Sequence, residues 1–157
     1  MEREALKKAM KRSISEVLEK MFFLPVDFAD TGLKEELWSP ETTDKILVAR
    51  LNFNGPLSGL CHFMIPEDLT RSLTAGFMGE REESVNDVQI TETVKEITNM
   101  LVGNTFSKFD NQKMFDLGIP EMVDFRSVEK GHSGSGDEIF IAIQTIDSRL
   151  AFQMSFN

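Results

Sequence analysis

The chain has 157 residues, of which 41% are hydrophobic and 27% are charged, a composition typical of one ordinary globular domain. Its 26 acidic residues outnumber its 17 basic residues, and the formal net charge of −9 repels the phosphates of nucleic acids and of anionic lipids. No apolar run approaches the roughly 18 residues that a membrane span requires, and the charged N-terminal sequence is unlike a secretory signal. We therefore expect a single cytoplasmic domain over residues 1–157, with no nucleic-acid or membrane partner.

Hydrophobic periodicity predicts helices and β-hairpins along the chain. Apolar residues at three- and four-residue steps are typical of amphipathic helices, and β-rich runs beside turn signals are typical of hairpins. In the first half these patterns predict a helix over residues 3–23, a connecting loop with a short edge strand over 27–44, a hairpin of 45–53 and 57–65, and a short helix over 67–78. In the second half they predict a long helix over 87–109, a loop to residue 120, a strand over 121–129, a polar linker over 130–136, and a hairpin of 139–145 and 149–156.

The two halves resemble each other, because each contains a helix, a poorly patterned stretch and then a hairpin. The early hairpin is LVARLNFNGPLSGLCHFMIP and the late one is IFIAIQTIDSRLAFQMSF. A weak internal duplication accounts for this likeness. It predicts an α+β domain with pseudo-twofold symmetry, in which long helices pack on one face of a mixed or antiparallel sheet. Alternation over residues 150–156 predicts a last strand that is buried on one face only.

The predicted helix over residues 87–109 carries a polar stripe opposite its apolar face. At about 100° per residue, the apolar side holds Ile90, Val94, Ile97 and Leu101. The opposite sector, about 60° wide, holds Glu92, Glu96, Asn99 and Gly103. On spacing alone, such a stripe is more often a solvated helix face than a site. The asparagine and glycine, however, cost together about 1–1.5 kcal/mol relative to alanine, a local cost that indicates a functional surface.

The run ITETVKEITNMLVGN, residues 90–104, resembles the motif helix of the CheC/CheX family of chemotaxis phosphatases. The family motif is Asp or Ser, three residues, Glu, two residues and Asn, followed some twenty residues later by Pro. Glu96 and Asn99 match the Glu and Asn, and Pro120 follows Asn99 with 20 residues between them. Glu92 stands where the family has Asp or Ser, so we assign it an auxiliary role. The stretch GPLSGLCHFMIPEDL is similar to the second strand and following helix of that family.

The first predicted helix carries only part of the same motif. Its corresponding residues are Ser15, Glu19 and Phe22, with phenylalanine where the family has asparagine. One half of the duplication is therefore expected to be inactive. With a single complete motif, the chain is more similar to CheX than to CheC.

The resemblance implies a phosphatase that acts on the phosphorylated aspartate of a CheY-like response-regulator receiver. Asn99 would position the attacking water, and Glu96 would pair with a lysine of the receiver. Glu92 and Gly103 would contact this partner, Gly103 by allowing the two backbones to approach. The chain would need no cofactor or metal of its own, because the receiver supplies Mg²⁺. CheX proteins are commonly dimers, so the resemblance also implies a homodimer.

Two other functions remain open on the same residues. A non-catalytic CheX-like module could use the stripe to bind or sequester a phosphorylated receiver without hydrolysing it. A flagellar switch component is the weaker alternative, because it leaves Glu96 and Asn99 without a role.

Other candidate motifs predict no chemistry. Cys61 and His62 are neighbours in a predicted strand, so their side chains point to opposite faces and cannot form a nucleophile–base pair. Two histidines and one cysteine without ligand spacing predict no metal site. The sequence GHSGSGD, residues 131–137, leads into a strand and lacks the lysine of a phosphate-binding loop.

Overall fold

One antiparallel sheet forms the centre of the computed structural model, which describes residues 2–30, 32–39, 41–128 and 137–157. Over these residues the sheet has seven strands in the order β1-β6-β7-β3-β2-β4, with β5 also paired to β2. The strands are β1 (Asp27–Ala29), β2 (Ile46–Asn54), β3 (Gly59–Pro66), β4 (Asp116–Leu117), β5 (Glu121–Val123), β6 (Glu138–Gln144) and β7 (Arg149–Phe156). The hairpins β2–β3 and β6–β7 meet at the antiparallel pair β3–β7 in the middle of the sheet, so both belong to one antiparallel sheet.

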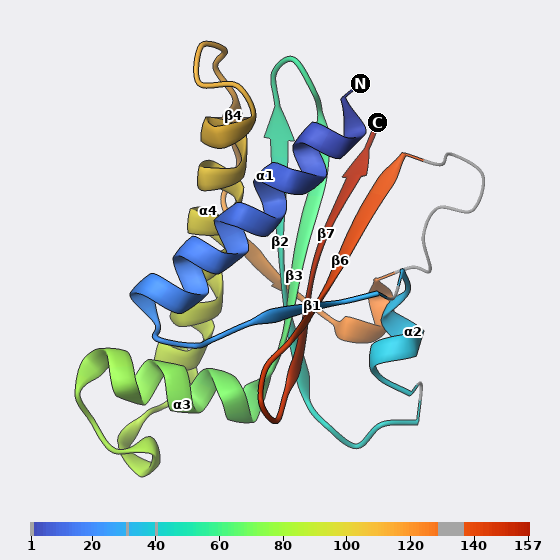
Figure 1. Cartoon of the computed structure of the whole chain (residues 1–157). Coiled ribbons are helices and arrows are strands. Elements are labelled where there is room, and N and C mark those ends of the chain that lie inside the picture. The colour runs from blue at the N-terminus through green and yellow to red at the C-terminus, as the bar shows by residue number, and fades with distance from the viewer. Residues whose placement is uncertain (1, 31, 40, 129–136) are drawn as a thin grey trace.

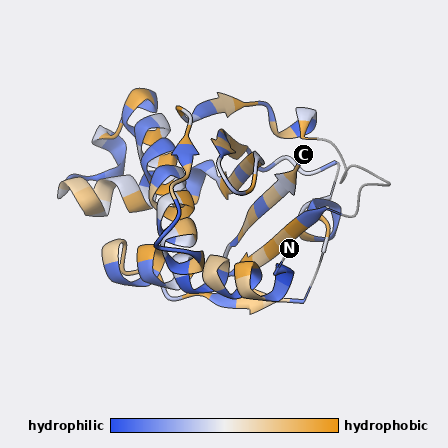
Figure 2. Ribbon diagram, turned by 90° about the horizontal axis from the view of Figure 1, so that it is seen from above, coloured by the Kyte–Doolittle hydropathy of each residue, from blue (hydrophilic) through white to orange (hydrophobic). Residues whose placement is uncertain are grey.

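Helices precede both hairpins and follow the first one (Figure 1). The α-helices are α1 (Arg3–Ser15), α2 (Lys34–Leu37), α3 (Glu67–Met78) and α4 (Asp87–Phe109). A π-helical segment, η1 (Glu16–Met21), continues α1, and two short 3₁₀ helices are η2 (Glu82–Ser84) and η3 (Phe125–Ser127). Seen from above, hydrophilic and hydrophobic residues are mixed along the helices (Figure 2), and α1, α3 and α4 each bury a set of apolar residues.

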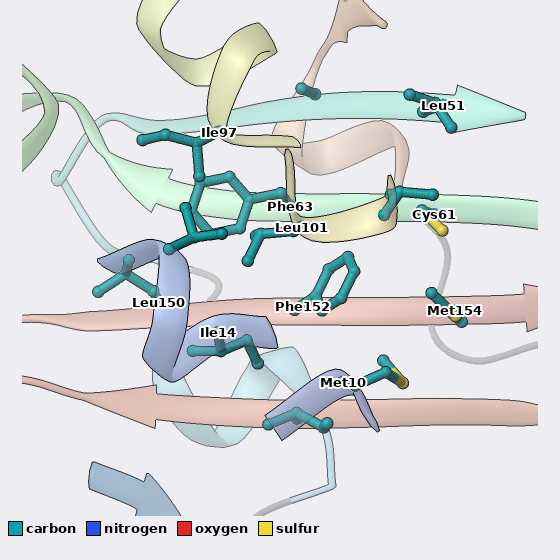
Figure 3. Packing of buried hydrophobic residues seen from close by; sticks show 14 of the residues in the cluster. Met10, Ile14, Leu51, Cys61, Phe63, Ile97, Leu101, Leu150, Phe152 and Met154 are labelled. Atoms are coloured by element: carbon teal, nitrogen blue, oxygen red, sulfur yellow. The ribbon is translucent and has the colours of Figure 1, made fainter. Parts of the chain in front are cut away.

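The main hydrophobic core lies on one face of the sheet, where α1 and α4 cover it. Figure 3 shows side chains of these helices meeting those of the strands, among them Ile14, Leu101, Phe63 and Phe152, all fully buried. Within this layer the Ser13 hydroxyl donates a hydrogen bond to the carbonyl oxygen of Leu101 at 2.9 Å. The bond ties α1 to the middle of α4 and helps to fix which side of α4 faces outward.

A second cluster covers part of the opposite face of the sheet. It consists of Leu37, Trp38, Ile46, Val48, Met64, Val128, Ala142 and Ala151. The prediction that β7 is buried on one face only is therefore wrong, because Ala151 is fully buried and Gln153 is only 5% exposed. The cover comes from segments distant in sequence, with the Trp38 ring packed edge-on against Phe125 at 5.6 Å between ring centres.

Most predicted elements are confirmed, with two changes of length or form. The first helix begins where predicted, turns π-helical after Ser15, and ends at Met21, two residues before its predicted end. The strand predicted over residues 121–129 ends at Val123, because the Asp124 carboxylate accepts a hydrogen bond from the Arg126 N–H at 2.9 Å and starts a 3₁₀ turn. The predicted linker over residues 130–136 lies outside the described residues.

Candidate functional site

Helix α4 is held in a fixed orientation by its N-terminus and by its apolar face. At its start, the Asn86 side chain accepts a hydrogen bond from the Gln89 N–H at 2.9 Å, and the Gln89 side chain accepts one from the Asn86 N–H at 3.0 Å. This capping box satisfies backbone donors that a helix otherwise leaves unpaired. The predicted apolar face is buried, at no more than 2% exposure for Ile90, Val94, Ile97 and Leu101.

The four stripe residues lie on the outward side of this helix. Glu92 and Glu96 are exposed, and Asn99 and Gly103 are half-buried. Within the part of the chain that the structure describes, no hydrogen bond or ion pair engages the side chain of Glu96 or Asn99. Being three residues apart, they lie about 4.5 Å apart along the helix axis. A carboxylate and an amide are therefore presented together, and a partner can bind both without breaking an internal contact.

Glu92 differs from Glu96 in having a neighbour of opposite charge. Its carboxylate lies 3.8 Å from the Lys95 ammonium, and the two side chains are 68% and 32% exposed. An ion pair with this exposure contributes little to stability, because water and salt screen it. Glu92 therefore has a cationic neighbour, whereas no ion pair of the described residues engages Glu96, the carboxylate beside Asn99.

Gly103 is not required by the internal packing of the protein. A β-carbon added at Gly103 would meet no atom within 4 Å outside its own helix and chain neighbours. Gly103 lines a hollow of about 240 Å³ at the C-terminal end of α4, together with Phe106, Ser107, Phe115 and Leu117. Since a mid-helix glycine costs up to about 1 kcal/mol relative to alanine, the open space points to a use outside the fold.

The segment from β4 to β5 runs antiparallel to α4 and forms the wall beside the stripe. Leu117 shares the hollow with Gly103, and Val123 shares another hollow, of about 400 Å³, with Thr91 near the start of α4. Pro120, which the resemblance singled out, is buried between these two points. The sequence analysis treated residues 110–120 as a plain loop and missed this wall. The run Gly118-Ile119-Pro120 is a signal of an irregular strand, because glycine and proline both interrupt regular pairing. This signal could have indicated the wall.

The partial motif of the first helix has a different geometry. Ser15 ends the α-helical part, so Glu19 and Phe22 follow on or after a π-helical turn. The Glu19 carboxylate accepts a hydrogen bond from the Val26 N–H at 3.2 Å, and the Phe22 ring contacts Phe77 at 5.4 Å between centres. This half lacks both the amide and a free carboxylate.

The remaining candidates form no second site in the described residues. Cys61 is fully buried in β3, and burial raises the pKa of its thiol well above the ordinary value, which disfavours the reactive thiolate. Over the described ranges, no group of three or more His, Cys, Asp or Glu is arranged to hold a metal ion. None of the helices described combines the length and apolarity needed to cross a membrane.

Solved structures share this fold over nearly the whole chain. A CheC-like superfamily protein from Shewanella sp. PV-4 has a TM-score of 0.75 and 21% sequence identity, covering 98% of this chain and 97% of its own. The chemotaxis protein CheX from Vibrio vulnificus has a TM-score of 0.73 and 20% identity, with 97% and 96% covered. CheX in the CheX–CheY–BeF₃–Mg²⁺ complex from Borrelia burgdorferi has a TM-score of 0.70 and 14% identity, with 96% of each chain covered. These similarities confirm the predicted fold.

Sequence comparison agrees with the structural one. No curated protein sequence matches the chain significantly. The sequence profile of the family described as chemotaxis phosphatase CheX matches residues 47–144, which include all of α4 and Pro120. Since this match spans more than half of the chain, the protein belongs to the CheX family of chemotaxis phosphatases.

Proposed function

We propose that this protein docks α4 on a CheY-like receiver and hydrolyses the aspartyl phosphate of that receiver. The observation that carries the proposal is the unengaged pair of Glu96 and Asn99, one turn apart on the outward side of a capped helix. Membership of the CheX family supports the reaction type. The Borrelia burgdorferi structure, a complex of CheX with CheY, BeF₃ and Mg²⁺, supports a receiver as the partner.

Asn99 acts by holding a water molecule in line with the phosphorus atom. Its side-chain oxygen accepts a hydrogen bond from the water, and the amide neither takes a proton permanently nor forms a covalent bond. Water attacks phosphorus, the bond from phosphorus to the acyl oxygen breaks, and the products are inorganic phosphate and a free aspartate carboxylate. Because an acyl phosphate is already activated, positioning supplies most of the needed acceleration.

Glu96 anchors the receiver in the correct register. Its carboxylate pairs with a receiver lysine, and this charge-assisted contact strengthens when docking excludes water. Gly103 lets the receiver backbone come close to α4, and Glu92 contacts the receiver at the edge of the docking surface. The charge on the phosphoryl oxygens is neutralised by the receiver's own Mg²⁺ and lysine, so the proposal assigns no metal to this chain.

A non-catalytic receiver-binding module is the second candidate. Glu92 stands at the first motif position in place of Asp or Ser and is paired with Lys95, which favours a weakened or altered site. Such a module would bind the phosphorylated receiver and leave the lifetime of its phosphate unchanged or longer.

For either function, we also propose that the protein forms a homodimer in which the stripe stays free. Sedimentation velocity tests whether the protein is a dimer.

The lifetime of the receiver phosphate separates the two candidates. Each CheY-like receiver encoded in the same genome is phosphorylated with acetyl phosphate, freed of the donor, and followed with and without the protein. The proposed activity predicts faster loss of phosphate from at least one receiver. Asn99→Ala should abolish the acceleration, whereas Asn104→Ala, on the same helix but outside the stripe, should retain it. Binding to phosphorylated receiver without acceleration would support the non-catalytic module instead.

A further inference from the structure

A β-bulge lies in the wall beside α4. The Gly118 N–H donates a hydrogen bond to the Asn52 carbonyl oxygen at 2.8 Å, and Glu121 pairs with Arg50. Only Leu51 lies between Asn52 and Arg50 on β2, so both Ile119 and Pro120 stand opposite that one residue. Proline has no N–H to offer the ladder and is well suited to such an interruption. Bulges of this kind re-aim a side chain and are frequent beside active sites.

The bulge turns one apolar side chain into solvent. Pro120 is buried, whereas Ile119 is 89% exposed. Met114 and Leu117 on the same segment are also exposed, at 85% and 38%. A single exposed apolar residue needs no explanation, but several on one short segment are typical of an interaction surface. We call Met114, Leu117 and Ile119 the apolar ridge.

One residue of the apolar ridge, Ile119, lies level with Asn99. Leu117 and Gly103 line the same hollow. From Leu117 to Ile119 the chain advances by about 6.6 Å at the usual rise of an extended strand. From Gly103 back to Asn99 the helix covers about 6 Å. Because the two segments are antiparallel, Ile119 comes alongside Asn99.

The charged pair that lines the hollow does not favour a partner of either sign. Asp110 and Lys113 both line the hollow, and their charged groups lie 3.7 Å apart in a partly exposed ion pair. The pair has no net charge, so it selects neither a positive nor a negative partner. Glu96 can orient a receiver, but it is exposed and offers little affinity before water is excluded.

We propose that the apolar ridge is the second part of the receiver-docking surface, with Ile119 contacting an apolar patch of the receiver beside its phosphorylated aspartate. The inference rests on the proposed function, because a receiver whose phosphoryl group reaches Asn99 must also lie over the segment alongside it. Ile119 then determines which receivers bind: those with an apolar side chain at this place are accepted, and those with a charged one are rejected.

The test compares two isoleucines of similar exposure. Ile119 is 89% exposed, and Ile146, in the turn between β6 and β7, is 95% exposed. Affinity for the receiver bound to beryllium fluoride and Mg²⁺ is measured by titration calorimetry, and the hydrolysis rate is measured at saturating protein. Ile119→Ser should raise Kd by about 10-fold or more, the loss expected for one buried aliphatic side chain. The saturated rate should stay near the wild-type value, and Ile146→Ser should change neither quantity.

Further variants separate this inference from the proposed activity. Ile119→Leu should retain binding, and Met114→Ser should weaken it in the same direction as Ile119→Ser. Asn99→Ala should bind normally and fail to hydrolyse. If the wild type binds the receiver but does not hydrolyse its phosphate, the proposed activity is wrong. The titrations still show whether Ile119 contributes to receiver binding. An unchanged Kd for Ile119→Ser, an equal loss for Ile146→Ser, or no binding by the wild type overturns the inference.

Discussion

Asn99 and Glu96 divide the proposed work between positioning and anchoring. An amide oxygen can orient water at any ordinary pH because it does not titrate, whereas a carboxylate provides charge for a fixed cationic partner. Neither side chain is engaged elsewhere in the described part of the chain. Their roles were proposed from the family motif, and the structure adds that both lie on the solvent side of α4.

Replacing Gly103 by alanine should stabilise the free protein and weaken docking. The added methyl group meets no neighbour within 4 Å, and alanine is a better helix former by up to about 1 kcal/mol. On the proposed function, the same methyl group keeps the receiver backbone away from α4, so Kd should rise. Denaturant unfolding measures the first effect, and titration with the beryllium fluoride-bound receiver measures the second.

Gly76 in α3 provides the matched control for Gly103. A β-carbon there also meets nothing within 4 Å. Gly76→Ala should therefore raise stability without changing Kd. If Gly103→Ala stabilises the protein and leaves docking intact, Gly103 has no part in the interface.

At the level of elements, the two halves of the duplication differ in backbone as well as in sequence. Helix α4 is α-helical throughout, whereas the first helix becomes π-helical from Glu16 onward, directly after Ser15, the first residue of its partial motif. The Glu19 carboxylate is already bonded to the Val26 N–H. Restoring the missing amide alone does not recreate the arrangement of α4.

Phe22→Asn should therefore not create a second active site. The cleanest measurement is the hydrolysis rate of the double variant Phe22→Asn, Asn99→Ala, which should equal that of Asn99→Ala alone. A recovery of activity would show that the π-helical turn does not prevent catalysis. The phenylalanine at residue 22, in place of the asparagine of the motif, would then be the reason that the first half is inactive.

A charged contact joins the two helical elements, and its contribution should depend on pH. The Lys108 ammonium lies 2.8 Å from the Glu16 carboxylate, and this hydrogen-bonded contact lowers the pKa of Glu16 below its ordinary value of 4.5. A carboxyl whose pKa is lowered by folding stabilises the native state above its unfolded pKa, and the benefit is lost as the pH falls through the folded pKa.

Glu16→Gln should lower the denaturation midpoint near neutral pH and have no effect below the folded pKa of Glu16. Unfolding curves of both proteins at about pH 7 and at the lowest pH at which the wild type remains folded measure the difference. Glu83→Gln, at an exposed residue of η2, serves as the control. An equal destabilisation at both pH values would show that the side chain acts through packing and not through its charge.

Local patterns predicted the elements well where one feature dominated. The 3.6-residue period placed α4 at its observed bounds, and the turn signals placed both hairpins. The strand after Pro120 was predicted too long, because its end depends on the Asp124 side chain competing for the backbone. The bulge at Ile119 was missed because it exists only relative to β2, whose pairing is not visible in the local sequence.

For the whole molecule, the duplication predicted the main architecture but not the second cluster. Two helix–hairpin halves imply a shared sheet with the long helices on one face, which the structure has. The cover on the other face comes from contacts such as Trp38 with Phe125, which are far apart in sequence. Sequence periodicity carries no information on such contacts. The burial of both faces of β7 therefore could not be derived from the alternation of its residues.

The whole account depends on Asn99 accelerating hydrolysis in a docked receiver. The most direct measurement is the single-turnover rate of phosphate loss from a receiver saturated with the protein, compared between wild type and Asn99→Ala. Loss of about 3 kcal/mol of transition-state positioning predicts a rate roughly a hundredfold lower for the variant, with Kd for the beryllium fluoride-bound receiver unchanged. Equal saturated rates for the two proteins would contradict the account.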